Sequence, residues 1–212
     1  MNKPLPILFI LIFAAQISHA QFFKSFGLKA AYTSANQTSS GWHDETYKFN
    51  RKSGVSAAIF AEWLNLSYFS LVTQIEYAQR GTRNTFLWPN IEPAPLRYVT
   101  VDNRLDYLSA LPLVKVAVPL TPVRPYIFAG PRFDFLLGFK STLGGYGYDD
   151  LYNSFKKSTV GASLGLGVQL VDILPVQVTI EGRYNADLSS ALPDSRTNFR
   201  NNAYDIWLGF AM

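Results

Sequence analysis

The chain has 212 residues, of which 16% are charged and 15% are aromatic, and its formal net charge is +4. The absence of cysteine excludes disulfides, thiolate metal sites and cysteine nucleophiles. The positive charges are scattered and form no basic stripe of the kind that binds nucleic acid, so we expect no nucleic-acid partner.

The N-terminal segment, residues 1–20, has the pattern of a secretory signal peptide. Lys3 precedes an apolar run, Leu5–Ala15, and the segment ends on a small residue, Ala20. The apolar run has about 11 residues and is too short for a spanning helix, which needs about 20. We therefore expect export through the inner membrane, cleavage after Ala20 and a mature domain over residues 21–212.

Eight later segments alternate between apolar and polar or small residues with a period of two, which predicts β-strands. In the last of them, for example, Ile206, Leu208 and Phe210 share one face, and Asp205 and Trp207 share the other. The eight segments span residues 22–35, 53–64, 68–81, 105–118, 124–139, 158–171, 176–186 and 203–212.

The connections between these segments alternate between short and long. Short ones are expected at 65–67, 119–123 and 172–175, and long polar ones at 36–52, 84–103, 141–157 and 188–202. This alternation predicts an all-β, up-and-down antiparallel meander. It is typical of an outer-membrane barrel with short periplasmic turns and long extracellular loops.

Folding adjacent segments onto each other tests the faces assigned to them. The expected opposite pairs are Trp63 with Phe69, Val114 with Ala129, Lys115 with Phe128, and Pro112 with Pro131. These pairs keep apolar residues on one face of the sheet, as strand pairing requires. Two opposed prolines within central strands predict a local defect in the ladder.

Charged residues gather on the polar faces, where they alternate with glycine and alanine. Five are positive and five negative: Lys29, Glu62, Glu76, Arg80, Lys115, Arg132, Asp134, Glu181, Arg183 and Asp205. Small residues beside long charged ones suit a narrow lumen, and balanced charge suits a closed interior, because a buried unpaired ion is costly.

The opposite faces are nearly uncharged, and aromatic residues stand toward their ends. This set comprises Phe26, Tyr32, Trp63, Phe69, Tyr77, Phe139, Tyr184 and Phe210. Aromatic girdles at both ends of an apolar band are typical of transmembrane barrels. A soluble lipocalin-like barrel would turn its apolar faces inward instead. The sequence favours the membrane barrel, with eight strands closed by pairing 203–212 with 22–35, because hydrocarbon tolerates no open sheet edge.

Four stretches, "FGLKAAYTSAN", "IEYAQRGT", "YLSALPLVKV" and "PYIFAGPRFDFLLG", resemble the PorT-like outer-membrane β-barrel family. The resemblance covers essentially the whole mature chain and implies an eight-stranded barrel. The family often has an acidic residue where this chain has Ser109. The PorT protein is implicated in protein secretion across the outer membrane, so the resemblance implies an accessory role in secretion as one candidate function.

An eight-stranded barrel has an interior that side chains can fill. The ten charges therefore predict a salt-bridged structural plug, with Arg183 and Asp205 on neighbouring strands as the foremost ion pair. The alternative is a narrow gated channel for small solutes, in which the pairs exchange partners to open.

His43 is the one histidine of the expected mature chain and lies in a polar loop. It would be the base of an outer-membrane enzyme, which is the third functional alternative, but no G-x-S-x-G nucleophile motif accompanies it. We therefore expect no catalytic residue, no metal and no cofactor.

These patterns together predict a non-enzymatic barrel in the outer membrane of a Gram-negative-type envelope. Its role would be structural or in protein interaction. We expect as partners the lipid of that membrane, the barrel-assembly machinery during insertion, and envelope or secretion proteins.

Overall fold

The computed structural model describes residues 23–40, 46–64, 66–88, 97–143, 146–147, 155–172, 175–192 and 198–212. The expected signal peptide, residues 1–20, lies outside this part of the chain. The strands are β1 (Phe23–Ser40), β2 (Thr46–Lys48), β3 (Lys52–Trp63), β4 (Phe69–Trp88), β5 (Arg97–Ala117), β6 (Val123–Leu143), β7 (Tyr146–Gly147), β8 (Ser158–Leu170), β9 (Gln177–Asp187) and β10 (Asn198–Ala211). In the described ranges, no helix is long and apolar enough to cross a membrane.

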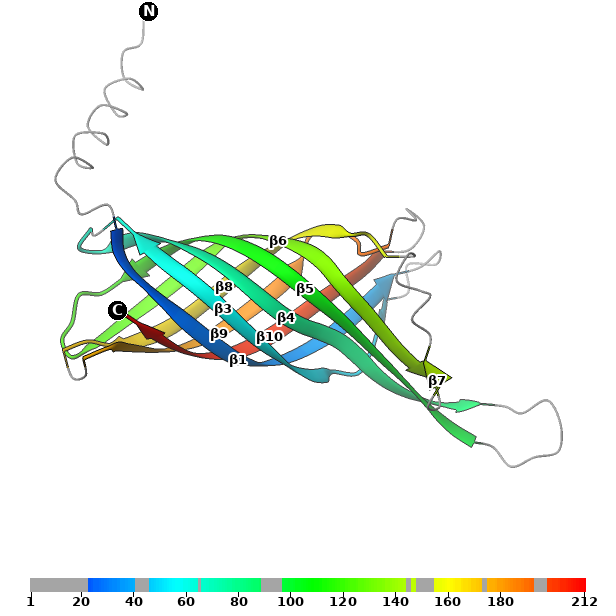
Figure 1. Cartoon of the computed structure of the whole chain (residues 1–212). Helices are drawn as coiled ribbons and strands as arrows, with labels where there is room; N and C mark the ends of the chain where they lie inside the picture. The colour runs from blue at the N-terminus through cyan, green and yellow to red at the C-terminus, as the bar shows by residue number, and fades with distance from the viewer. Residues whose placement is uncertain are drawn as a thin grey trace, which may run out of the picture.

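Eight long antiparallel strands form a closed ring (Figure 1). The order around the ring is β1, β3, β4, β5, β6, β8, β9 and β10, and β10 pairs with β1 from Gly27 opposite Ala211 to Ser40 opposite Asn198. The short strands β2 and β7 pair only with β1 and β6. The expected up-and-down barrel and its closure are confirmed.

The two faces of the sheet are inverted relative to those of a soluble barrel. Ile180 and Leu166 are exposed on the outside, with exposed fractions of 50% and 66%, whereas Glu181 is 3% exposed in the interior. The outward side chains form an apolar band that water would not favour and acyl chains would. This inversion agrees with the face assignments made from the sequence.

Two predicted hairpin registers had different outcomes. In β5 and β6, Val114 lies opposite Ala129, as expected. In β3 and β4, Trp63 lies opposite Leu71 and not Phe69, so that prediction was wrong by two residues. The turn is longer than expected, with Leu64 in the left-handed backbone region at a φ of 61°. A slip of two residues preserves the faces, which explains why the face assignment survived.

The ladder between β5 and β6 is interrupted where the two prolines were expected to meet. Pairing stops at Ala110 opposite Phe133 and resumes at Val114 opposite Ala129 in the same register. That register places Pro112 opposite Pro131. Proline has no backbone N–H to donate, so the gap is the expected consequence of the sequence.

Phe139 was predicted to face outward with the aromatic girdle, and this prediction was wrong. The β5–β6 register shifts between Asp106 and Tyr107, which leaves Leu137 as an extra residue in β6. One extra residue reverses the facing of every residue beyond it. Phe139 is therefore 6% exposed and packs inside the barrel.

Several strands extend into segments that were predicted as loops. β4 continues to Trp88 and β5 begins at Arg97, so this hairpin projects beyond the rest of the ring (Figure 1). The exposed face of this extension carries Arg83, Thr85 and Tyr98, and Thr85 contacts Thr100 across the two strands at 3.1 Å. The inward residues Thr82 and Asn84 are polar as well, so the apolar–polar alternation that marks a strand is absent here.

Glycines on the inner face make room for the large side chains of the lumen. At Gly161 a Cβ atom would lie 2.7 Å from the Arg132 guanidinium, and at Gly165 it would lie 2.3 Å from the Phe128 ring. These separations are far below ordinary carbon contacts, which are about 3.5–4.0 Å. The interior is thus packed to the point where a methyl group does not fit.

The substitution Gly165→Ala is expected to destabilise the folded barrel by about 1–3 kcal/mol, because the added methyl group must displace Phe128. Gly182→Ala is the matched control, since a Cβ there meets no atom within 4 Å. We expect the control to be neutral or slightly stabilising. Urea titration of the folded and unfolded bands on unheated gels measures both, and equal midpoints would contradict the packed-lumen interpretation.

Candidate functional site: the charged interior

All ten charged residues that the sequence placed in the lumen lie in the barrel interior. Their exposed fractions range from 0% for Arg132 to 7% for Lys29. Buried charges of this kind persist only when ion pairs and hydrogen bonds compensate the loss of water. The pairings therefore decide what the interior can do.

Eight interior charges form one continuous series, which we call the ion-pair chain. Its members, in order of contact, are Lys29, Glu181, Arg183, Glu76, Arg80, Asp134, Arg132 and Asp187. Cations and carboxylates alternate along it, and it links β1, β9, β4 and β6 across the lumen. It crosses the barrel instead of following neighbouring strands.

Arg183 joins the β9 and β4 members of the ion-pair chain. Its Nη1 donates to Glu76 at 2.7 Å and its Nη2 to Gln74 at 3.1 Å, and the Glu181 carboxylate lies 3.6 Å from Nη2. The guanidinium also lies over the Trp207 ring, at 4.6 Å from the centroid. Arg183 thus holds β9 to β4 and β10 through polar and cation–π contacts.

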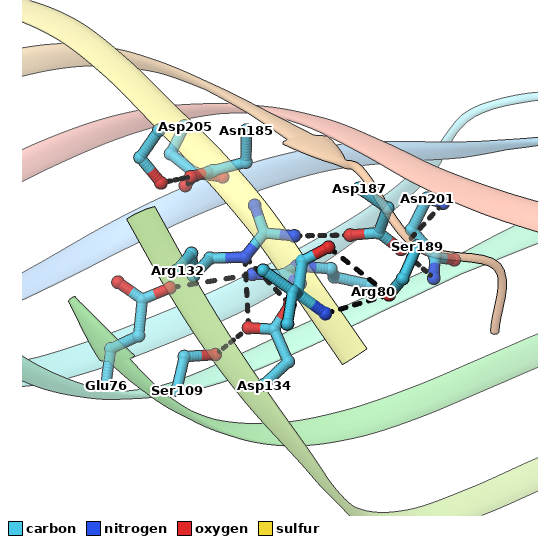
Figure 2. A network of polar contacts seen from close by, with 12 residues as sticks. Glu76, Arg80, Ser109, Arg132, Asp134, Asn185, Asp187, Ser189, Asn201 and Asp205 are labelled. Carbon is cyan, nitrogen blue, oxygen red and sulfur yellow. Dashed lines mark hydrogen bonds and ion pairs between the residues drawn. The ribbon is translucent and has the colours of Figure 1, made fainter. Parts of the chain in front are cut away.

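Toward the end with the long strands, Asp134 accepts from two arginines and a hydroxyl (Figure 2). Arg80 donates at 3.0 Å, Arg132 Nε at 2.8 Å and Ser109 Oγ at 2.5 Å. Figure 2 shows Arg132 between Asp134 and Asp187, and it donates to both. The bonds satisfy much of the hydrogen-bonding capacity of these buried groups.

Toward the end with the short turns, Glu62 forms a separate cluster. It accepts from Lys24 at 2.7 Å, from Lys115 at 3.0 Å and from Ser70 at 2.5 Å. Lys115 also donates to Gln169 at 3.3 Å. This cluster joins β1, β3, β4, β5 and β8 just inside the rim.

The predicted ion pair between Arg183 and Asp205 is not formed. The two residues are directly opposite each other in the β9–β10 ladder, but Arg183 reaches across the lumen to Glu76. Asp205 instead accepts from Asn185 at 2.5 Å. The other interior carboxylates of the described residues each have a cation within 4.0 Å, and Asp205 has none.

Two members of these networks were missed from the sequence. Asp187 shares the inner face of β9 with Glu181 and Arg183, and the predicted strand ended one residue before it. Continuing the alternation by one residue would have included it. The alternation in the sequence places Lys24 on the outward face, so it gave no sign of a contact in the lumen. The β1–β3 register is irregular between Phe23 and Ser25, and Lys24 therefore reaches Glu62.

The lumen also contains an apolar layer that the sequence analysis did not identify. Its members are Phe60, Val72, Leu111, Leu113, Ala117, Tyr126, Phe128 and Ala211. Between this layer and the charges of Lys29, Glu62, Lys115 and Glu181 remains a cavity of about 10 Å³, which is about the space of a single water molecule. The interior at this level is therefore filled by side chains.

The described residues contain no group of three or more histidines, aspartates or glutamates arranged to hold a metal ion. His43 lies outside the described residues. Apart from Asp205, the interior presents a set of mutually paired carboxylates, ammonium groups and guanidinium groups. Such a set rigidifies a barrel when its members remain paired.

Among solved structures, the chain is similar to several outer-membrane barrels at low identity. OprG of Pseudomonas aeruginosa has 10% identity and a TM-score of 0.50, covering 90% of this chain and 97% of OprG. Neisserial surface protein A has 16% identity and a TM-score of 0.47, covering 88% of this chain and 97% of that one. Ail of Yersinia pestis, crystallised with the heparin analogue sucrose octasulfate, has 16% identity and a TM-score of 0.45. The match covers 89% of this chain and 98% of Ail. Identities this low show the fold alone.

No curated protein matches the sequence. A family model, described as the outer membrane protein beta-barrel domain, matches residues 15–192. That match includes every strand of the ring except β10, which closes it. The chain therefore belongs to the outer membrane protein β-barrel domain family and is an eight-stranded barrel of the outer membrane.

Proposed function

We propose that this barrel is a non-enzymatic protein of the cell envelope that acts by interaction and not by conducting solutes. The observation that carries the proposal is the filled interior, where the ion-pair chain and the apolar layer leave a cavity of about 10 Å³. Since a solute has no path through such a lumen, the surfaces available for function are the two ends and the outer wall.

The resemblance to the PorT-like family supports a more specific role, as an accessory to protein secretion across the outer membrane. Co-purification from gently solubilised envelopes tests this role. The control is the same purification of another outer-membrane barrel of equal abundance. Enrichment of secretion proteins is the expected result. Enrichment of the barrel-assembly machinery alone would indicate insertion and no accessory role.

We predict that the purified full chain, inserted in planar bilayers, produces no stepwise current. Side chains fill the lumen at the apolar layer and leave a cavity of only about 10 Å³, so ions have no open path through the barrel. Insertion is verified in the same sample by the mobility of the folded band. Reproducible unitary currents would contradict the proposal and favour the narrow gated channel.

The enzyme alternative has a separate test. A screen on lipid and peptide substrates compares the full chain with the His43→Ala variant. We expect both to be inactive. An activity that disappears on this substitution would replace the interaction role with a catalytic one.

A further inference from the structure

In the part of the chain that the structure describes, exposed cations without acidic partners lie around one end of the barrel and not the other. Four of them, which we call the basic collar, are Arg51, Lys140, Lys156 and Arg200. In the described ranges, none of the four has a carboxylate within 4.0 Å. Among the described residues at the short-turn end, by contrast, the cations Lys24 and Arg124 are half-buried and the exposed charge is that of Asp172.

The basic collar lies just beyond the apolar band. Each member stands three or four residues from an exposed apolar or aromatic side chain of the same or the adjoining strand. These side chains are Val55, Leu137, Val160 and Tyr204 respectively. Four residues span roughly 13 Å along a strand, or about 10 Å along the membrane normal at a tilt of about 40°. Since the headgroup layer extends roughly 5–8 Å beyond the hydrocarbon, side chains this long reach it.

One member of the basic collar is held in a fixed orientation. Arg51 Nη1 donates to the carbonyl of Ser34 at 3.0 Å, and its guanidinium lies over the Tyr204 ring at 4.6 Å. Tyr204 in turn stacks against Tyr184, with ring centroids 4.9 Å apart. Arg51 remains exposed, so its other N–H groups face the surroundings. Arg200 lies two strands away across β1, on the same outer face.

We propose that the basic collar binds the phosphate groups of lipid headgroups in the outer leaflet. A guanidinium presents planar paired donors that match phosphate oxygens, and a preorganised one loses less entropy on binding. The location at headgroup depth favours a lipid over a soluble anion. Because the basic collar lies at one end only, that end would favour the leaflet that carries the phosphates.

The test uses the folded full chain in a zwitterionic detergent, with binding measured by native mass spectrometry. The probes are bisphosphorylated lipid A and the same lipid after removal of its phosphates. We expect the phosphorylated form to bind at least tenfold more tightly. Equal binding of the two lipids would overturn the proposal, since acyl chains alone would then account for it.

Variants locate the site. R51Q/R200Q should weaken lipid A binding roughly 30-fold, because each cation near an anionic surface contributes about fivefold. R51K/R200K keeps the charge and should keep most of the affinity. R83Q is the control, because Arg83 stands six residues beyond Tyr77 and is already 3.3 Å from Asp102. Equal losses for R83Q and R51Q/R200Q, or tight binding of a soluble sulfated polysaccharide, would overturn the assignment to lipid. Unheated gels verify that each variant is folded.

Discussion

Substituting Arg183 by glutamine should lower the free energy of unfolding by about 3–5 kcal/mol, the cost of removing one partner from a buried ion pair. The substitution leaves Glu76 with a longer contact to Arg80, at 3.7 Å, and takes a cation away from Glu181. It also removes the stacking on Trp207. Urea titration of the refolded chain measures the loss.

Two further variants separate an ion-pair effect from general damage. The double variant R183Q/E76Q removes both charges and should recover a large part of the lost stability, because no carboxylate is then left without its closest cation. R104Q removes a partly exposed arginine, since the Arg104 side chain is 36% exposed and pairs with Asp106. This change should lower the free energy of unfolding by less than about 1 kcal/mol. If R183Q and R104Q cost the same, the ion-pair chain does not stabilise the barrel.

The sequence predicts the faces of this barrel well because alternation is a local property. Whether Leu166 points to lipid and Glu181 to the lumen depends only on parity within one strand. Closure follows from the same residues, since a chain that must satisfy its backbone in hydrocarbon cannot keep an open edge.

The sequence predicts partners across the lumen poorly because they depend on distance through the barrel. Arg183 and Asp205 are neighbours in the ladder, and this suggested a pair. A guanidinium on a long side chain reaches the opposite wall of so narrow a lumen, where Glu76 lies. Residue spacing along the chain does not tell which strands lie opposite each other across the lumen.

Local irregularities explain the remaining differences. The extra residue at Leu137 turned Phe139 inward, and the longer turn after Trp63 moved its partner by two positions. The turn after Trp63 bears no glycine or proline, whereas Gly138 adjoins the extra residue and is the one local mark of that irregularity. Both depend on how the whole sheet closes, which no single strand reveals.

The substitution Leu164→Arg tests whether the outward face of the barrel contacts lipid. Leu164 is 60% exposed and is the central member of the outward series on β8, which runs from Val160 to Val168. Arginine at the midplane of a lipid-facing wall costs about 2–4 kcal/mol. We expect this loss in refolding titrations performed in lipid vesicles.

Leu188→Arg is the matched control, because Leu188 is 61% exposed and lies one residue past the end of β9, at the rim. The same substitution there should cost no more than about 1 kcal/mol, since headgroups and water solvate the guanidinium. If the outward face of this barrel met water and not lipid, both positions would be solvated, and both changes would stay within about 0.5 kcal/mol of zero. A large loss at Leu164 combined with a small loss at Leu188 therefore requires hydrocarbon around the middle of the wall. Two small losses would mean that the apolar band does not contact lipid.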